Sequence, residues 1–260
     1  MLLAIDTGNT QTVIGLFENG QLSDHWRIAT EASRTSDELA LVVQQFLAFH
    51  GSSFDAQLSG VVIASGVPSI TAALREMTIR YFGFEALVLE PGVRTGMPIL
   101  YDNPKEVGPD RIADAVAAYD LYGGPTIVVD FGTANTIEAV SAKGEYLGGA
   151  IFPGIEISMD ALFGRAAALR RVELVPPRNV IGKSTVESIQ SGALYGFSGQ
   201  VDALVDKFQE ELGECTVVAT GGNAKLIMPF SRTIQHHEPW LTLHGLRIVY
   251  ERNHGEIGHT

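Results

Sequence analysis

The sequence has a single cysteine, Cys215, among its 260 residues. An intramolecular disulfide is therefore impossible, which is consistent with a reducing compartment. Cys215 precedes the apolar run Thr216-Val217-Val218-Ala219, so we expect a buried strand here with a small core thiol beside it. Zinc-type cysteine spacings and the HExxH pattern are missing too. His236 and His237 lack an evident third ligand, and we expect a solvated pair rather than a metal site.

The sequence also lacks a long apolar run and an excess of basic residues. No run approaches the ~18 apolar residues that span a membrane. The first residues have no basic leader and are interrupted by Asp6, so we expect no signal peptide and a soluble, cytoplasmic protein. With 18 Lys and Arg against 30 Asp and Glu, the net charge is −12, which disfavours a nucleic-acid partner. An anionic ligand would then need local backbone donors, a few basic groups or a metal ion.

Long disorder is not expected, because charged residues make up 18% of the chain and apolar residues 45%. The length allows one large domain or two modest ones. Gly123-Gly124-Pro125 interrupts the sequence near its middle, directly after a predicted helix. We therefore predict two domains, residues 1–122 and 123–260.

Short β-branched segments alternate with amphipathic ones in both halves, which predicts an α/β fold with mixed sheets. Two local signals are strong: Asn19-Gly20 predicts a hairpin turn, and Thr35-Ser36-Asp37-Glu38 has the capping-box spacing that begins a helix. Strands are expected at residues 2–5, 12–17, 21–28, 60–65, 86–89, 126–129, 137–141, 145–151 and 216–220. Helices are expected at residues 35–50, 68–82, 108–122, 155–169 and 184–212, followed by short helices to about residue 253.

The most specific feature is a duplication. A strand, an Asp-x-Gly turn, a second strand, a turn and a third strand occur at residues 2–28 and again at 126–151. Gly8 and Gly132 in these turns would let the backbone approach a bulky anion, and the N–H groups that follow can bind phosphate oxygens. Asp6 and Asp130 could hold a magnesium ion, directly or through water. Either turn alone could instead be an Asx turn at a strand end.

Two further segments suggest a nucleotide and an acceptor. In Ala219-Thr220-Gly221-Gly222-Asn223, a buried strand runs into a double glycine and a helix, which can accommodate an anion and a flat ring or form an ordinary turn. In Gly108-Pro109-Asp110-Arg111, Asp110 lies in the first turn of a helix. It could cap that helix, or it could take a hydroxyl proton during phosphoryl transfer while Arg111 binds a substrate carboxylate. Gly182-Lys183-Ser184-Thr185 is not a Walker loop, because Pro177 stands where the first glycine is required.

Two phosphate turns followed by a glycine-rich strand end resemble the actin/sugar-kinase/Hsp70 superfamily. Together, the motifs resemble type III pantothenate kinase over nearly the whole chain. The motifs that carry this resemblance are Asp6-Thr7-Gly8-Asn9-Thr10, Arg34-Thr35-x-Asp37-Glu38, Tyr101-Asp102-Asn103-Pro104, Gly108-x-Asp110-Arg111, Asp130-Phe131-Gly132-Thr133-Ala134, Gly148-Gly149-Ala150-Ile151-x-Pro153-Gly154, Gly182-Lys183-x-Thr185 and Thr220-Gly221-Gly222.

The resemblance implies two related ribonuclease-H-like domains with mixed sheets and an active site in the cleft between them. It implies transfer of the ATP γ-phosphoryl group to the primary hydroxyl of pantothenate, giving 4′-phosphopantothenate in the first step of coenzyme A biosynthesis. A homodimer is implied as well, with substrate sites near its interface. So are a divalent ion such as Mg²⁺ and a monovalent cation, K⁺ or NH₄⁺.

The resemblance also implies roles for individual residues. Asp110 would be the base, Asp130 would lie at the monovalent-cation site, and Asp6 would hold the divalent ion, directly or through water. The residues implied to bind ATP are Asp6, Thr7, Gly8, Asn9, Thr10, Gln11, Thr12, Val13, Thr133, Gly221 and Gly222. Those implied to bind pantothenate are Tyr101, Gly108, Pro109, Asp110, Arg111 and Thr185.

Three positions depart from the family pattern: Pro109 replaces a small residue, Asn135 a common threonine, and Asn223 an apolar residue. None of them removes a charged group that the chemistry needs. One alternative is a sugar or carboxylate kinase of the same fold, although the larger sugar kinases carry insertions that 260 residues do not accommodate. A regulator that binds ligand without turnover should have lost an acid such as Asp6, Asp110 or Asp130, and all three are present. A chaperone-like ATPase would need a separate peptide-binding domain.

Overall fold

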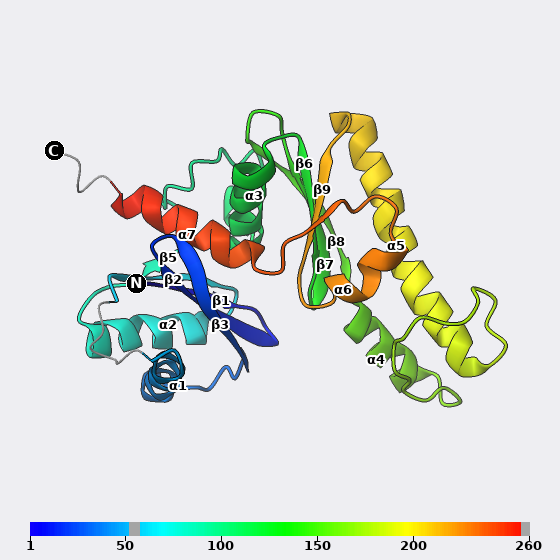
Figure 1. Ribbon diagram of the computed structural model, residues 1–260, viewed down its shortest axis with the longest axis horizontal. Coiled ribbons are helices and arrows are strands. Elements are labelled where there is room, and N and C mark those ends of the chain that lie inside the picture. Colours follow the sequence, from blue (N-terminus) through cyan, green and yellow to red (C-terminus); the bar gives the residue numbers. More distant parts are fainter. Residues whose placement is uncertain (52–57, 256–260) are drawn as a thin grey trace. The chain divides into compact units, whose positions relative to one another are not determined.

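The computed structural model describes residues 1–51 and 58–255, and the chain divides into two compact units (Figure 1). Unit 1 comprises Met1–Ala117 and Leu241–Thr260, and unit 2 comprises Ala118–Trp240. The sequence-based division at residues 122 and 123 differs from these units in the C-terminal part of the chain. Helix α7 (Leu241–His254) belongs to unit 1 because it packs on strands β1, β2 and β4 of that unit.

Unit 1 is built on a five-stranded mixed sheet of order β3-β2-β1-β4-β5. The central strand β1 is antiparallel to β2 and parallel to β4. The strands are β1 (Leu2–Thr7), β2 (Gln11–Glu18), β3 (Gln21–Ala29), β4 (Gly60–Ser65) and β5 (Leu87–Val88). The helical elements of the first half are α1 (Ser36–Phe49), α2 (Pro68–Met77) with its π-helical continuation η1 (Thr78–Phe82), the 3-10 turn η2 (Pro104–Glu106) and α3 (Pro109–Tyr122).

The two strong local signals form as predicted. Asn19 and Gly20 have positive φ angles of 50° and 78°, the conformation of a two-residue hairpin turn between β2 and β3. The Thr35 hydroxyl accepts a hydrogen bond from the Glu38 N–H at 3.3 Å, and the Glu38 carboxylate accepts one from the Thr35 N–H at 2.8 Å. This capping box satisfies free N–H groups at the start of α1.

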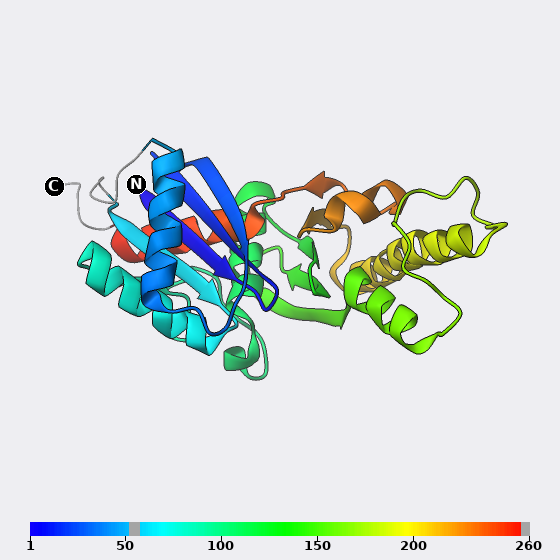
Figure 2. The ribbon, with the colours of Figure 1, turned by 90° about the horizontal axis from the view of Figure 1, so that it is seen from below.

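Helices cover both faces of the unit 1 sheet. Leu3 and Ile5 of β1 pack in a buried cluster with residues of α1 and α2, and Figure 2 shows α1 lying across the strands. Ala4 pairs with Gly15 on the opposite face, where a Cβ on Gly15 would lie 2.7 Å from a methyl carbon of Leu243 in α7. Because side chains alternate along a strand, Asp6 lies on the α7 face.

Unit 2 repeats the architecture of unit 1. Its sheet has the order β10-β9-β6-β7-β8, in which β6 is antiparallel to β7 and parallel to β9, as β1 is to β2 and β4. The predicted duplication is therefore present in the topology. The strands are β6 (Thr126–Phe131), β7 (Ala134–Val140), β8 (Tyr146–Pro153), β9 (Thr216–Thr220) and β10 (His236–His237). The helical elements are α4 (Ile155–Arg165), α5 (Thr185–Leu212), α6 (Ala224–Ile227) and the 3-10 turn η3 (Met228–Phe230).

The long helix α5 covers one face of the unit 2 sheet. Its residues Ala193, Phe197 and Val201 pack in a buried cluster with Val129 and Phe131 of β6. Cys215 belongs to the same cluster and is 2% exposed, which confirms the expected core thiol. Burial raises the pKa of this thiol.

Three sequence-based expectations differ from the structure. The helix predicted to reach residue 169 ends at Arg165. Residues 241–254 form one helix rather than several short ones. His236 and His237 form the short strand β10. It pairs in parallel with β9, whose outer edge is otherwise open for backbone hydrogen bonds. His236 is exposed, whereas His237 is half-buried. Over residues 1–51 and 58–255, no helix has both the length and the apolar character needed to cross a bilayer.

Candidate active site

The first Asp-x-Gly turn follows β1 at the sheet edge where the parallel strands β1 and β4 both end. Ligands of open α/β sheets bind at such carboxyl ends. The Gly8 N–H donates to the Gln11 carbonyl at 3.0 Å and closes the turn. The Gly66 N–H, just after β4, donates to the Thr7 carbonyl at 3.1 Å. The turn is thus hydrogen-bonded to the sheet on both sides, and its residues 8–11 are exposed.

Asp6 and Thr7, the last residues of β1, point to opposite faces of the sheet. Asp6 is half-buried. Thr7 is 1% exposed, and its Oγ1 has no hydrogen-bond partner among the residues that the structure describes. The opposite residue Thr12 is also buried, with its Oγ1 2.9 Å from the Thr30 hydroxyl. A ligand at this turn would therefore meet Asp6 and the exposed turn rather than the Thr7 hydroxyl.

The second Asp-x-Gly turn occupies the equivalent place after β6. The Gly132 N–H donates to the Ala134 carbonyl at 3.2 Å, and Thr133 at the middle of the turn is exposed. Asp130 pairs across the sheet with Thr136 of β7 and Thr220 of β9. Asp6 has the corresponding partners Val13 and Ala64. The two aspartates thus hold matching positions in two matching sheets.

Two glycines from distant parts of the sequence lie against the second turn. Gly221 has a φ of +90°, and a Cβ there would overlap the Asp130 carboxylate and lie 2.6 Å from the Phe131 nitrogen. The Gly154 N–H donates to the Thr133 carbonyl at 3.0 Å, and a Cβ on Gly154 would overlap the turn backbone. The structure therefore brings the predicted residues Asp130, Thr133 and Gly221 together. Gly222 follows and is exposed.

Gly154 was not predicted as a site residue. The signal was present in the sequence, because Gly154 ends the glycine-rich motif that begins at Gly148. Gly154 is also the N-cap residue of α4, with a φ of −67°. Its requirement for glycine therefore comes from close packing against the turn rather than from its own backbone angle.

The segment from Gly108 to Arg111 begins α3. Pro109 is the first helical residue, where the missing N–H and fixed φ of proline are well tolerated. Asp110 is exposed, and its Oδ1 accepts a hydrogen bond from the Arg111 N–H at 2.9 Å. A Cβ on Gly108 would lie 2.4 Å from that same oxygen, so a larger residue would require the Asp110 side chain to move. Arg111 is 8% exposed, and Tyr101 in the preceding segment is half-buried.

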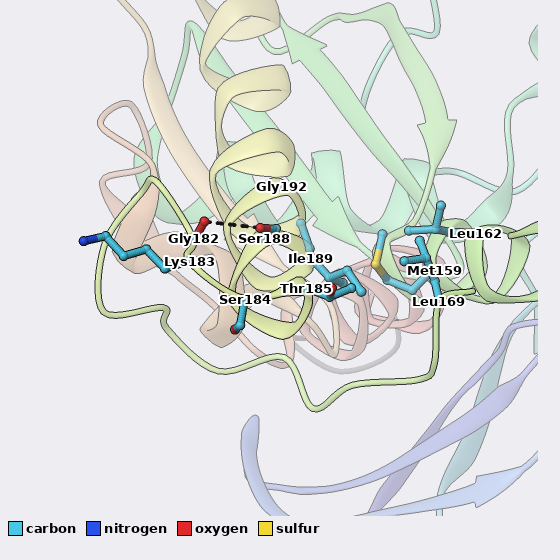
Figure 3. A pocket seen from close by; sticks show the side chains of 11 residues that line it. Met159, Leu162, Leu169, Gly182, Lys183, Ser184, Thr185, Ser188, Ile189 and Gly192 are labelled. Carbon is cyan, nitrogen blue, oxygen red and sulfur yellow. Dashed lines mark hydrogen bonds between the residues drawn. The ribbon is translucent and has the colours of Figure 1, made fainter. Parts of the chain in front are cut away.

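Thr185 lies in a pocket of unit 2 formed by α4, the segment after it and the start of α5 (Figure 3). The pocket has a volume of about 690 Å³. Met159, Leu162 and Leu169 form its apolar side, and hydroxyl-bearing residues at the start of α5 form the other. A helix N-terminus attracts anionic groups, so the pocket suits a ligand with one polar and one apolar part. Among the described residues that line it, Thr185 is the one predicted site residue.

The two turns offer the carboxylates of Asp6 and Asp130 to a cation. Across residues 1–51 and 58–255, no group of three or more His, Cys, Asp or Glu side chains could hold a metal ion. Mg²⁺ does not need such a cage, since it usually keeps several waters and binds one or two carboxylates together with substrate phosphates. Asp6 and Asp130, each beside an exposed turn, fit an ion of this kind that arrives with a phosphorylated substrate.

The chain is similar in sequence to proteins of one known family. A family model described as type III pantothenate kinase matches residues 2–207. The type III pantothenate kinase of Streptomyces griseus subsp. griseus is 56% identical over 261 residues, which cover 97% of this chain and 98% of that protein.

Solved structures show the same fold at low identity. A Baf family protein from Campylobacter jejuni has a TM-score of 0.62 at 18% identity, over 97% of this chain and 99% of that one. A ROK family glucokinase from Streptomyces griseus, in complex with glucose and AMPPNP, has a TM-score of 0.53 at 13% identity, over 96% and 98% of the two chains. The fold is therefore of the actin/sugar-kinase/Hsp70 type, as expected. On its sequence, the chain belongs to the type III pantothenate kinase family.

Proposed function

We propose that the protein transfers the γ-phosphoryl group of ATP to the primary hydroxyl of pantothenate, giving ADP and 4′-phosphopantothenate. This reaction begins coenzyme A biosynthesis. The observation that carries the proposal is the pair of Asp-x-Gly turns at equivalent strand ends of two sheets with the same strand order. Each turn offers backbone N–H groups and a carboxylate that can face a cation, which suits a phosphate-bearing ligand. Family membership supports pantothenate as the acceptor.

The nucleotide is assigned to both turns and to the glycines after β9. The first turn, residues 6–13, contributes through the Asp6 carboxylate and the exposed residues 8–11, and the second contributes the exposed Thr133. Gly221 and Gly222 follow β9 beside Asp130, and the family resemblance assigns them to the adenosine side of the nucleotide. The turns would bind the phosphates through backbone N–H groups, so the net charge of −12 does not oppose binding locally.

Asp110 is assigned as the base. In the reaction, its carboxylate takes the proton of the pantothenate hydroxyl while the hydroxyl oxygen forms a bond to the γ-phosphorus. The bond between that phosphorus and the bridging oxygen breaks, and ADP leaves with the electron pair. The Asp110 carboxylate is exposed, and its Oδ1 accepts a hydrogen bond from the Arg111 N–H. Tyr101, Pro109 and the Arg111 guanidinium would bind the rest of pantothenate, the last by pairing with its carboxylate.

Two cations belong to the proposal. Asp6 would hold a divalent ion, directly or through water, and that ion would supply charge neutralisation for the phosphates of ATP. Asp130 would hold K⁺ or NH₄⁺. Each carboxylate lies beside an exposed turn, which supports a cation at each place, and the choice of ion at each follows the family resemblance.

A homodimer is proposed through the surface around the Thr185 pocket. Three exposed apolar side chains lie beside the residues of that pocket: Ile181 is 81% exposed, Val180 60% and Val186 47%. Leu162 of α4, which lines the pocket, is 36% exposed. A second copy that covered this surface would remove apolar area from water, at a gain of roughly 25 cal/mol for each Å². Thr185 would then lie at the interface. The predicted cytoplasmic location remains part of the same proposal.

The function is tested by coupled ADP release from purified protein with ATP, Mg²⁺ and pantothenate, with and without K⁺ or NH₄⁺. We expect release that requires pantothenate and is stimulated by the monovalent cation. Folded protein that releases no ADP under any of these conditions would contradict the proposal. Calorimetry with ATP and with pantothenate then separates a regulator, which binds without turnover, from a kinase for another acceptor, which binds ATP but not pantothenate.

A further inference from the structure

The C-terminal helix α7 contacts both segments that flank the predicted acceptor residues. It packs on β1, β2 and β4 of unit 1 (Figure 1), with Leu241, Leu243, Leu246, Ile248 and Val249 buried. The family match ends at residue 207, so this helix lies outside the matched residues. The function proposed above assigns it no part.

Near its C-terminal end, α7 holds the segment that precedes Tyr101. The Asn253 side-chain amide forms two hydrogen bonds with Arg94: Nδ2 donates to the Arg94 carbonyl at 2.9 Å, and Oδ1 accepts from the Arg94 N–H at 3.3 Å. The Arg252 guanidinium donates to the Thr95 carbonyl. Gly96 has a φ of +73°, and a Cβ there would overlap that guanidinium. Residues 94–96 are thus bound by the two consecutive side chains of α7.

Near its N-terminal end, α7 packs on α3, the helix that begins with Pro109 and Asp110. The Thr242 hydroxyl donates to Asp114 Oδ1 at 2.7 Å, and Asp114 is 2% exposed. A Cβ on Gly245 would lie 2.5 Å from the carbonyl carbon of Ala113, so the two helices are in backbone contact at this point. This contact fixes α3 one turn after the predicted base.

The chain between these two anchors carries the acceptor residues. Residues 98–108 are irregular apart from the 3-10 turn η2 and an isolated bridge at Ile99. The segment contains Tyr101 and leads into Gly108. Irregular segments have few backbone constraints of their own, so the position of this one depends on where its ends are held. One helix holds both ends.

We propose that α7 positions the acceptor-binding segment, with Asn253 and Arg252 as positioning residues at one end and Thr242 at the other. The inference rests on the proposed function, because it assumes that Tyr101 and residues 108–111 bind pantothenate. Loss of the Asn253 or Arg252 contacts should then weaken pantothenate binding and leave the ATP turns unaffected.

The test compares Asn253→Ala and Arg252→Ala with a control on the same helix, Glu251→Ala. Glu251 is exposed and forms an ion pair with Arg247 at 2.7 Å, so its loss removes a contact of α7 that does not involve the segment. We expect the KM for pantothenate to rise about tenfold in the first two variants, which is the order expected for loss of such hydrogen bonds. The KM for ATP should stay within about twofold of wild type. Arg252→Lys keeps one donor for the Thr95 carbonyl and should restore most of the pantothenate affinity.

Two outcomes would overturn the proposal. One is an unchanged KM for pantothenate in Asn253→Ala. The other is a parallel loss of ATP and pantothenate affinity with a lowered melting temperature, which indicates general destabilisation. Amide hydrogen exchange of residues 98–111 gives a readout that does not need turnover: it should become faster in Asn253→Ala and not in Glu251→Ala. If wild-type protein releases no ADP with pantothenate, the proposed function fails, while faster exchange in Asn253→Ala still shows that α7 holds the segment.

Discussion

Gly221 lies so close to Asp130 that a Cβ atom on the glycine would overlap the carboxylate. Gly108 stands in the same relation to Asp110. At both places, an acid assigned to the chemistry is packed against a residue without a side chain. At Gly221 the Phe131 backbone is overlapped as well, so glycine is needed there for space, besides any conformational freedom that it adds.

Gly221→Ala is expected to displace the Asp130 carboxylate and the adjoining Phe131 backbone. Since a misplacement of about 1 Å at a site can cost about 100-fold in rate, we expect kcat/KM for ATP to fall by about that factor. Stimulation by K⁺ or NH₄⁺ should weaken in parallel. Steady-state kinetics at several cation concentrations measure both effects.

Gly213→Ala is the matched control for this change. Gly213 has a similar φ of +84°, but a Cβ there would meet no atom within 4 Å. The control therefore carries the backbone cost of alanine at positive φ, about 1 kcal/mol or more, without the overlap. Equal loss of activity in both variants would show that strain alone, and not displacement of Asp130, explains the effect.

Asp110→Asn should remove the base while the fold survives, because asparagine has the same size and keeps an oxygen for the Arg111 N–H. We expect kcat to fall by about 10²- to 10⁴-fold, the usual contribution of a general base. Binding of ATP, followed by calorimetry, should not change. Asp120→Asn, at an exposed position of the same helix, should keep wild-type activity. Full activity in Asp110→Asn would remove Asp110 from the role of base.

Ile181→Glu should weaken the proposed homodimer, because it places a charge on the apolar surface beside the Thr185 pocket. Sedimentation equilibrium should show a larger monomer fraction than in wild type. Leu41→Glu is the control, since Leu41 is 63% exposed on α1 and lies outside the proposed interface. A wild-type protein that is monomeric at micromolar concentration would contradict the proposed assembly directly.

Asp202 should make the free energy of unfolding of unit 2 fall as the solution becomes acidic. Burial raises the pKa of its carboxyl, but hydrogen bonds from the Ser231 and Thr233 hydroxyls and from the Arg232 and Thr233 N–H groups outweigh it, so the pKa is lowered. The unfolded chain then binds a proton more readily than the folded one. This contribution to stability is therefore present above the usual value of 3.8 and is lost as the pH falls through the lower folded pKa.

Asp202→Asn should lower the free energy of unfolding by ~2 kcal/mol near neutral pH, and this difference from wild type should shrink below about pH 4. Urea unfolding at several pH values measures it. Asp206→Asn is the control, because Asp206 pairs with Arg232 at a more exposed position, where an ion pair is worth up to ~1 kcal/mol. A difference between wild type and Asp202→Asn that stays constant down to about pH 3 would contradict the lowered pKa.

Local sequence determined the individual elements and the identity of the chemical groups. The hairpin turn at Asn19 and Gly20 and the capping box at Thr35 and Glu38 depend on residues no more than three positions apart. Their geometry is determined by steric limits and hydrogen bonds between residues that are close in the sequence, so it can be predicted from the residue types alone. The two Asp-x-Gly turns could be recognised in the sequence for the same reason. Their repetition predicted two sheets of the same topology, which the structure contains.

Only the tertiary structure decided which distant residues meet. Three features depend on contacts between segments far apart in the chain. They are the place of α7 in unit 1, the packing of Gly154 and Gly221 against the turn after β6, and the pairing of His236 and His237 with β9. Such contacts form because they bury apolar surface or pair a free strand edge. Neither driving force specifies a particular partner, so the partner cannot be predicted from local sequence. The sequence thus determined what the turns and acids could do, and long-range packing decided where each of them lies.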